Sequence, residues 1–267
     1  MAKLPIIVLS FIVAAVVFAP FLAQYDPIAI NLDDIKSAPT LKHPFGTDCK
    51  GRDVFARVLY GGRISLGVSF AAALVSLGIG FTAGLISGYY GGWVDTLLMA
   101  LVDLTLAFPS LLLAIGISVI MPPTKFTVMA AIALVGWASF ARLIRGQVLK
   151  VKEMAYVEAA RSLGAGNLRI LLVHILPQCL SLGLVMLGIK FSGYILTEAS
   201  LSFLGLGPQP PTPSWGNMIG ENRAYILSEP WMMLFPGLAI AVTALCFNLF
   251  GDYLQEKHTT YHDSQRH

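Results

Sequence analysis

The chain has 267 residues, of which 56% are hydrophobic and only 12% are charged, and its formal net charge is +3. Because soluble domains carry charge on roughly a quarter of their residues, this composition excludes an ordinary water-soluble protein. No run of Lys and Arg interleaved with aromatic residues occurs, which argues against nucleic acid as a partner. The three cysteines share no metal-ligand spacing and require neither a metal nor a disulfide.

Most charges lie in short segments between long apolar ones, which is typical of a chain that crosses a membrane several times. A helix that spans a bilayer needs about 20 apolar residues. Six stretches meet this requirement, and they are predicted to be transmembrane helices: 4–23, 64–88, 97–121, 126–140, 179–204 and 231–250. The sequence therefore predicts an all-α membrane protein with about six transmembrane helices.

The first apolar stretch defines an expected N-terminal anchor, residues 1–24. A cleaved signal peptide is the alternative, but this apolar run is longer than a usual signal core, and Lys3 is the only positively charged residue before it. With the N-terminus inside, Lys and Arg in the loops number nine inside and seven outside. This difference is too small to fix the orientation by charge alone.

Three charged residues fall within or near the predicted spans: Asp103, Lys190 and Glu198. Charges inside a bilayer are costly and normally face a bundle interior or a wet cavity. Lys190 and Glu198 are eight residues apart, which places them on roughly one helix face. We interpret the three as candidates to line a translocation pathway; the alternative is a snorkelling Lys and a Glu near the membrane surface.

Glycines recur at every fourth position of the second span, as Gly80, Gly84, Gly88 and Gly92. Small residues on one face allow helix backbones to approach closely in lipid. The spacing predicts a packing face toward another helix, unless these glycines are incidental in a glycine-rich chain.

The most polar long loop, 143–178, is predicted to contain two short helices, 153–162 and 168–176. The turn Gly164–Gly166 separates them, Asn167 is expected to cap the second, and Pro177 is expected to separate it from the fifth span. Such a hairpin suits docking into a groove on another protein or lying on the membrane surface. Composition alone leaves both interpretations open.

The residues of this hairpin resemble the coupling loop in permeases of binding-protein-dependent ABC importers. The matching positions are Glu158, Ala159, Ala160, Gly164, Ile175 and Pro177. Two further blocks resemble the C-type subunit of the dipeptide/oligopeptide/nickel branch: Gly46, Thr47, Asp48, Gly51, Arg52 and Asp53 in the first loop, and Trp215 and Gly216 in the last one. The resemblance implies the ABC type I importer fold, with a cytoplasmic coupling helix that inserts into a cleft on an ATPase subunit.

The resemblance also implies a domain organisation and a set of partners. The expected segments are an anchor, 1–24; an extracytoplasmic loop, 25–63; a permease core, 64–254, that includes the coupling loop 143–178 and an extracytoplasmic loop, 205–230; and a cytoplasmic tail, 255–267. The expected partners are a second permease subunit in a heterodimer, two ATPase subunits, an extracytoplasmic substrate-binding protein and the lipid of the cell inner membrane. Both termini are then cytoplasmic.

No G-x-x-x-x-G-K-[ST] phosphate loop occurs in the sequence, so ATP and Mg are expected to bind to the partner ATPases rather than to this chain. We expect no catalytic residues, cofactor or metal site here, and di- or oligopeptides as cargo. Nickel or a metal chelate is the alternative cargo, for which His258, His262 and His267 of the tail are candidate ligands. The alternatives from other classes are an ATP-independent channel and an intramembrane enzyme built on Asp103 and Glu198.

Overall fold

The computed structural model describes residues 3–264, with side chains described for 4–257, and within that range every regular element is helical. The α-helices are α1 (Lys3–Val17), α2 (Ala19–Leu22), α3 (Val54–Tyr90), α4 (Gly92–Leu106), α5 (Ser110–Ile120), α6 (Lys125–Val151), α7 (Ala155–Ser162), α8 (Asn167–Arg169), α9 (Leu176–Phe203), α10 (Trp215–Asn222) and α11 (Trp231–Ser264). Leu32–Asp34 and Arg223–Tyr225 form single 3₁₀ turns, and Ile170–Ile175 is a π-helical segment that joins α8 to α9.

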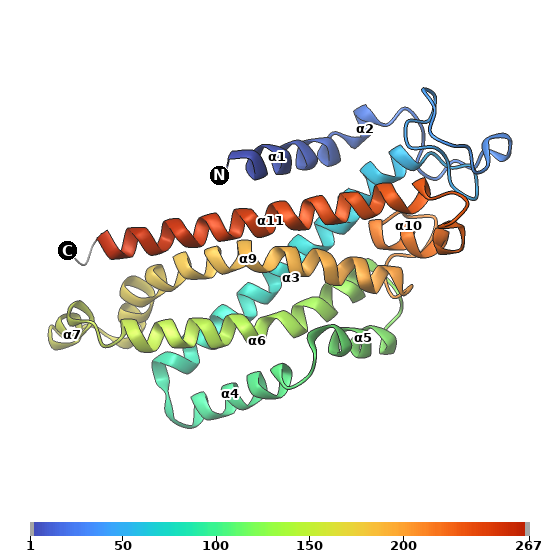
Figure 1. Ribbon diagram of the computed structural model, residues 1–267. Helices are drawn as coiled ribbons and strands as arrows, with labels where there is room; N and C mark the ends of the chain where they lie inside the picture. Colours follow the sequence, from blue (N-terminus) through green and yellow to red (C-terminus); the bar gives the residue numbers. More distant parts are fainter. Residues whose placement is uncertain (1–2, 265–267) are drawn as a thin grey trace.

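The long helices lie side by side as one bundle with two distinct ends (Figure 1). One end, which we call the hairpin end, carries α7 beyond the ends of α6 and α9, and α11 finishes on the same side. The opposite end, which we call the loop end, carries the non-helical segment 24–53 and α10. The candidate metal ligands predicted in the tail, His258, His262 and His267, lie outside the residues whose side chains are described.

Four helical stretches are long and apolar enough to cross a membrane: Val54–Tyr90, Lys125–Val151, Asn167–Phe203 and Trp231–Lys257. Helices α4 and α5 pass the same test together but are bent by 92°, and α1 is a shorter apolar helix. The predicted third span is therefore broken rather than continuous. Pro109 lies at the break, where it lacks a backbone N–H and disfavours a helical conformation in the residue before it.

Two helices extend further than the apolar pattern indicated. Helix α3 begins at Val54 instead of residue 64, and its first backbone N–H groups are capped by Asp53, whose carboxylate accepts from Ala56 N at 2.7 Å. Helix α6 continues to Val151 instead of residue 140, so the predicted loop 143–178 begins inside a helix. Charged residues in these extensions concealed them in the sequence, and three of them, Arg57, Arg142 and Arg145, pair with carboxylates of the bundle.

The packing of α3 on α6 forms the centre of the bundle, and the glycine stripe lies in it. A Cβ added at Gly80 would lie 2.6 Å from Phe140 Cβ, one at Gly84 would lie 2.5 Å from Ala141 O, and one at Gly88 would lie 2.8 Å from Val148 Cβ. Gly92 departs from the expected stripe. It follows the end of α3, has φ +57°, and faces open space, so it serves the turn into α4 rather than the packing face.

Candidate functional site

The hairpin between α6 and α9 is an ordered structure with a defined stop signal. Helix α7 ends in a Schellman motif: the Ala165 N–H donates to Ala160 O and the Gly164 N–H donates to Arg161 O, both at 3.0 Å. Gly164 has φ +84°, a conformation that side chains disfavour. Ala160 and Gly164 of the family pattern thus have a local structural reason: together they end the helix and turn the chain.

Helix α7 has one fully buried side chain, and most of its other residues are exposed. Val157 is completely buried in a cluster with Val151, Ile170, Ile175 and Cys179. Glu158 and Ala159 are exposed. Two leucines at the turn are exposed as well, Leu163 at 89% and Leu168 at 68%. An exposed carboxylate beside exposed leucines, on a projecting helix, is a surface suited to a protein partner.

The second half of the hairpin differs from its prediction. Asn167 does not cap a helix with its side chain; its Oδ1 instead accepts a hydrogen bond from the Tyr89 hydroxyl at 2.9 Å. Pro177 does not separate this segment from the fifth span, because α8, the π-helical segment and α9 form one helix from Asn167 to Phe203. The π turn lies immediately before the proline, and such turns accommodate a residue that cannot continue the ordinary hydrogen-bond pattern.

Several polar contacts tie the hairpin end of α3, α4 and α6 together. Arg145 forms a two-pronged pair with Asp95, with Nε and one terminal nitrogen each 2.6 Å from a carboxylate oxygen. The Ser87 hydroxyl donates to the same carboxylate, and Lys152 Nζ donates to Gly88 O at 3.2 Å. Paired guanidinium–carboxylate bonds of this kind fix orientation as well as distance. These contacts therefore hold the ends of α3, α4 and α6 together at the hairpin end of the bundle.

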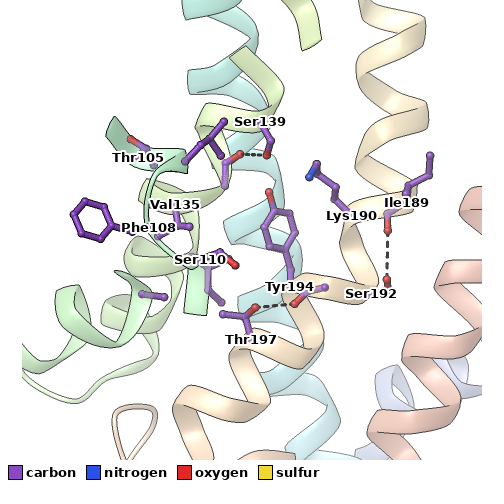
Figure 2. Close-up of a pocket in the computed structure, with 15 residues that line it drawn as sticks. Thr105, Phe108, Ser110, Val135, Ser139, Ile189, Lys190, Ser192, Tyr194 and Thr197 are labelled. Carbon is purple, nitrogen blue, oxygen red and sulfur yellow. Dashed lines mark hydrogen bonds between the residues drawn. The ribbon is translucent and has the colours of Figure 1, made fainter. Parts of the chain in front are cut away.

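A cavity of about 420 Å³ lies in the bundle beside the break between α4 and α5 (Figure 2). It is lined by the end of α4, the start of α5, the middle of α6 and the middle of α9. Hydroxyl groups contribute much of its polar surface: Thr105, Ser110, Ser139, Ser192, Tyr194 and Thr197. Irregular backbone within a membrane bundle is tolerated where it borders a cavity, and the break fits that pattern.

The structure separates the three charged residues proposed for a pathway. Lys190 lines this cavity, and its amine end points toward the side on which Tyr194 and Ser139 lie (Figure 2). Asp103 does not line it; its side chain is 68% exposed and pairs with Arg142 of α6. Glu198 does not line it either, because it is fully buried and accepts a hydrogen bond from Ser202 at 2.8 Å. The bundle therefore brings only one of the three to the cavity.

At the loop end, two arginines and two carboxylates form a buried cluster, which we call the outer clasp: Asp48, Arg52, Arg57 and Glu221. Arg52 Nε lies 2.6 Å from Asp48 Oδ2, and an Arg52 terminal nitrogen lies 2.7 Å from Glu221 Oε2. Arg57 reaches the same Glu221 oxygen at 3.1 Å. Burial by itself lowers the pKa of Arg52, but the charges of Asp48 and Glu221 outweigh it and raise the pKa above its usual value.

The other residues of the two loop-end blocks surround this clasp. The Asp53 carboxylate caps α3 and also lies 2.7 Å from His43 Nδ1, and Thr47 O accepts from Trp231 Nε1 at 3.2 Å. Gly46 and Gly51 have φ of +71° and +72°. These residues hold segment 24–53 against the start of α3 and the start of α11.

The last two residues of the blocks lie in α10, which packs against the same region. Trp215 is buried and its Nε1 donates to Val58 O at 2.8 Å. A Cβ on Gly216 would lie 2.8 Å from the backbone carbon of Ala199. Two blocks that are far apart in the sequence thus form one structural unit at the loop end.

Sequence reasoning missed three of the residues that build these sites: Asp95, Arg145 and Glu221. Each is an acid or base next to an apolar stretch, which is a weak signal by itself because such residues are usually solvated at a membrane surface. Their partners lie 50 residues or more away along the chain, as the Arg145–Asp95 and Arg52–Glu221 bonds show. Only the fold brings them together.

This arrangement defines a class: a multi-pass helical membrane protein with a cavity lined in part by hydroxyl groups and a projecting helical hairpin. The sequence model of the family described as "Binding-protein-dependent transport system inner membrane component" matches residues 80–259. The chain is 44% identical over 251 residues to the dipeptide transport system permease protein DppC of Alkalihalophilus pseudofirmus, covering 94% of this chain and 82% of the relative. It is 42% identical over 257 residues to the glutathione transport system permease protein GsiD of Escherichia coli, covering 96% and 85%.

A solved crystal structure of an amino acid ABC transporter with histidines has a similar fold. The TM-score is 0.58 at 17% identity, over 75% of this chain and 94% of that one. At this identity the likeness concerns the fold alone.

The chain belongs to the family of binding-protein-dependent transport system inner membrane components. It is a permease subunit of an ABC importer and a multi-pass inner-membrane protein, as the sequence predicted. Its family supplies the transport subunit of such importers rather than an enzyme.

Proposed function

We propose that this chain forms one half of the pathway of an ATP-driven importer for di- and oligopeptides. The observation that carries the coupling role is the projecting hairpin, which presents Glu158 and the exposed leucines Leu163 and Leu168 beyond the bundle. Two ATPase subunits, a second permease and an extracytoplasmic binding protein complete the assembly. ATP and Mg bind to the ATPases.

The orientation follows from that role. The hairpin and both termini are cytoplasmic, and the loop end with its outer clasp faces the binding protein. The chain is then divided into a retained anchor, outer loops, a permease core and a cytoplasmic tail, as expected from the sequence. Two boundaries differ: the core begins at Val54, and the coupling hairpin begins after Val151.

Motion of the ATPases reaches the pathway through rigid connections. The second half of the hairpin continues without interruption into α9, which lines the cavity with Lys190 and Tyr194. The Tyr89–Asn167 hydrogen bond links the second half of the hairpin to α3, and the Arg145–Asp95 pair links α6 to α4. A displacement of α7 is therefore passed to the walls of the cavity as a rigid-body movement, which switches access between the two sides.

The peptide cargo rests on the relatives and on the cavity. Relatives at 44% and 42% identity are named for dipeptide and glutathione transport, and both cargoes are short peptides. The cavity of about 420 Å³ lies in the size range of sites for small organic ligands, about 300–1,000 Å³. Its hydroxyl-rich lining matches the amide and carboxylate groups of such cargo.

The test is purification of the complex in mild detergent with the Glu158→Arg variant. We expect the wild-type chain to retain its second permease and ATPases, and the variant to lose ATPase association or to lower transport-coupled ATP hydrolysis by roughly tenfold or more. Asp252→Arg is the matched control, because Asp252 is an exposed acid on α11 outside the hairpin. A Glu158→Arg complex that hydrolyses ATP and imports peptide like the control would refute the coupling role, and ATP-independent flux would favour a channel.

A further inference from the structure

Lys190 is a cation with no counter-ion in the part of the chain whose side chains are described, 4–257. No carboxylate there lies within ion-pair distance of its amine, whereas Arg142 and Arg145 of α6 each pair with an acid of α4. Glu198, two turns further along α9, is buried away from the cavity, where its Oε1 accepts a hydrogen bond from Ser202 at 2.8 Å. The free charge of Lys190 therefore calls for a partner from outside this chain.

Lys190 lies near the middle of α9, far from both ends of the helix. It lies 14 residues after Leu176 and 13 residues before Phe203 in α9. At a rise of 1.5 Å per residue, both ends of α9 are about 20 Å away, which is farther than a Lys side chain extends to reach water. Its amine must instead be solvated by the contents of the cavity that it lines.

The other groups in the cavity accept or donate hydrogen bonds but carry no charge. Ser139 donates to Gly136 O at 3.0 Å and Thr197 donates to Gly193 O at 2.8 Å (Figure 2), so each hydroxyl oxygen keeps lone pairs that can accept a hydrogen bond. No Asp, Glu, Arg or second Lys is among the lining residues. The cavity thus combines a single positive charge with several neutral hydroxyls, which favours an anionic group over a cationic one.

We propose that Lys190 is a carboxylate-binding group in the pathway, and that it favours the passage of cargo with a net negative charge. This inference rests on the proposed function, since it takes short peptides as the cargo. The ammonium group donates charge-assisted hydrogen bonds to a cargo carboxylate while the hydroxyls accept from cargo N–H groups. The site is transient, because a transport pathway must release what it binds.

The test uses the complete transporter in proteoliposomes, with its ATPases, second permease and binding protein. Uptake of three peptides of similar size, Gly-Glu, Gly-Gln and Gly-Lys, is measured for wild type, Lys190→Gln and Lys190→Arg at saturating binding protein. Lys257→Gln is the control, because it removes one exposed positive charge from α11 outside the cavity. Co-purification of the second permease is measured on the same preparations.

The expected result is a change in selectivity. Lys190→Gln lowers uptake of Gly-Glu roughly tenfold relative to Gly-Lys, the loss of one modest charge interaction, while Lys190→Arg and Lys257→Gln keep the wild-type ratio. Because all three peptides carry a C-terminal carboxylate, equal loss for all three would overturn the preference for net negative charge and leave the peptide function standing. Loss of the second permease from Lys190→Gln would also overturn it, since Lys190 would then pair with an acid of that subunit. If wild type transports none of the three, the peptide function itself fails.

Discussion

The glycine stripe of α3 gives the sharpest prediction about what holds the bundle together. Replacing Gly84 by Ala places a Cβ 2.5 Å from Ala141 O and 2.9 Å from Ile144 Cβ. The first of these neighbours is backbone, which cannot rotate away. The added methyl group must therefore push α3 and α6 apart or shift one along the other.

The size of the effect follows from two opposed contributions. Overpacking a well-packed interface by a methylene-sized group costs about 1–3 kcal/mol. Ala is the better helix former in solution by up to about 1 kcal/mol, which offsets part of this cost. We expect a net destabilisation of about 1–2 kcal/mol, which lowers the midpoint of thermal unfolding by roughly 2–8 °C for a chain of this size.

The matched control lies on the same helix. Gly78 of α3 has no atom within 4 Å of an added Cβ, so Gly78→Ala changes composition and propensity identically without a clash. The assay is the thermal midpoint of the detergent-solubilised complex, followed by the fraction that remains monodisperse after heating. Gly84→Ala should lower the midpoint, and Gly78→Ala should leave it unchanged or raise it slightly. Equal shifts for both variants would refute the close-packing explanation.

Two further predictions concern the loop end. Glu221→Ala leaves the buried Arg52 and Arg57 with Asp48 as their remaining carboxylate partner, and it should destabilise the loop end by about 3–5 kcal/mol. The expected readout is faster proteolysis of segment 24–53. A proteolysis rate like that of wild type would contradict a structural role for the outer clasp. A membrane-impermeant maleimide added to intact cells should label Cys49, because Cys179 and Cys246 are buried. Labelling of Cys49 only from the cytoplasmic side would reverse the proposed orientation. Burial raises the pKa of the Cys49 thiol, so its thiolate fraction is small at neutral pH and labelling should accelerate as pH rises through 8 to 9.

The outer clasp also changes how the family's loop residues are understood. Gly46, Thr47, Gly51 and Asp53 contact their own chain: they turn segment 24–53, cap α3 and receive Trp231. The Arg52 guanidinium donates its hydrogen bonds to Asp48 and Glu221. The geometry favours a structural task for this block.

The sequence by itself determined the apolar stretches, the glycine spacing and the hairpin, because each depends on residues close together in the chain. Periodicity and span length are local properties, so helix makes up most of each of the six predicted stretches, although the first and the third are interrupted. The E-A-A–Gly pattern is local in the same sense, since Ala160, Arg161 and Gly164 complete a helix stop within six residues. These features could be predicted without knowledge of the fold.

Only the tertiary structure decided where charged helix ends are buried and which polar residues share a site. The sequence alone placed Arg57 in a loop, but in the fold it pairs with Glu221, which lies 164 positions away in the chain. Arg145 was likewise placed in a loop, and in the fold it pairs with Asp95. The eight-residue spacing of Lys190 and Glu198 places them on roughly one helix face, but their environments differ. Lys190 lines a cavity, whereas Glu198 is buried beside Ser202. The physical reason is that the cost of a charge in a membrane bundle depends on its partners, and partners brought together by folding leave no pattern in the local sequence.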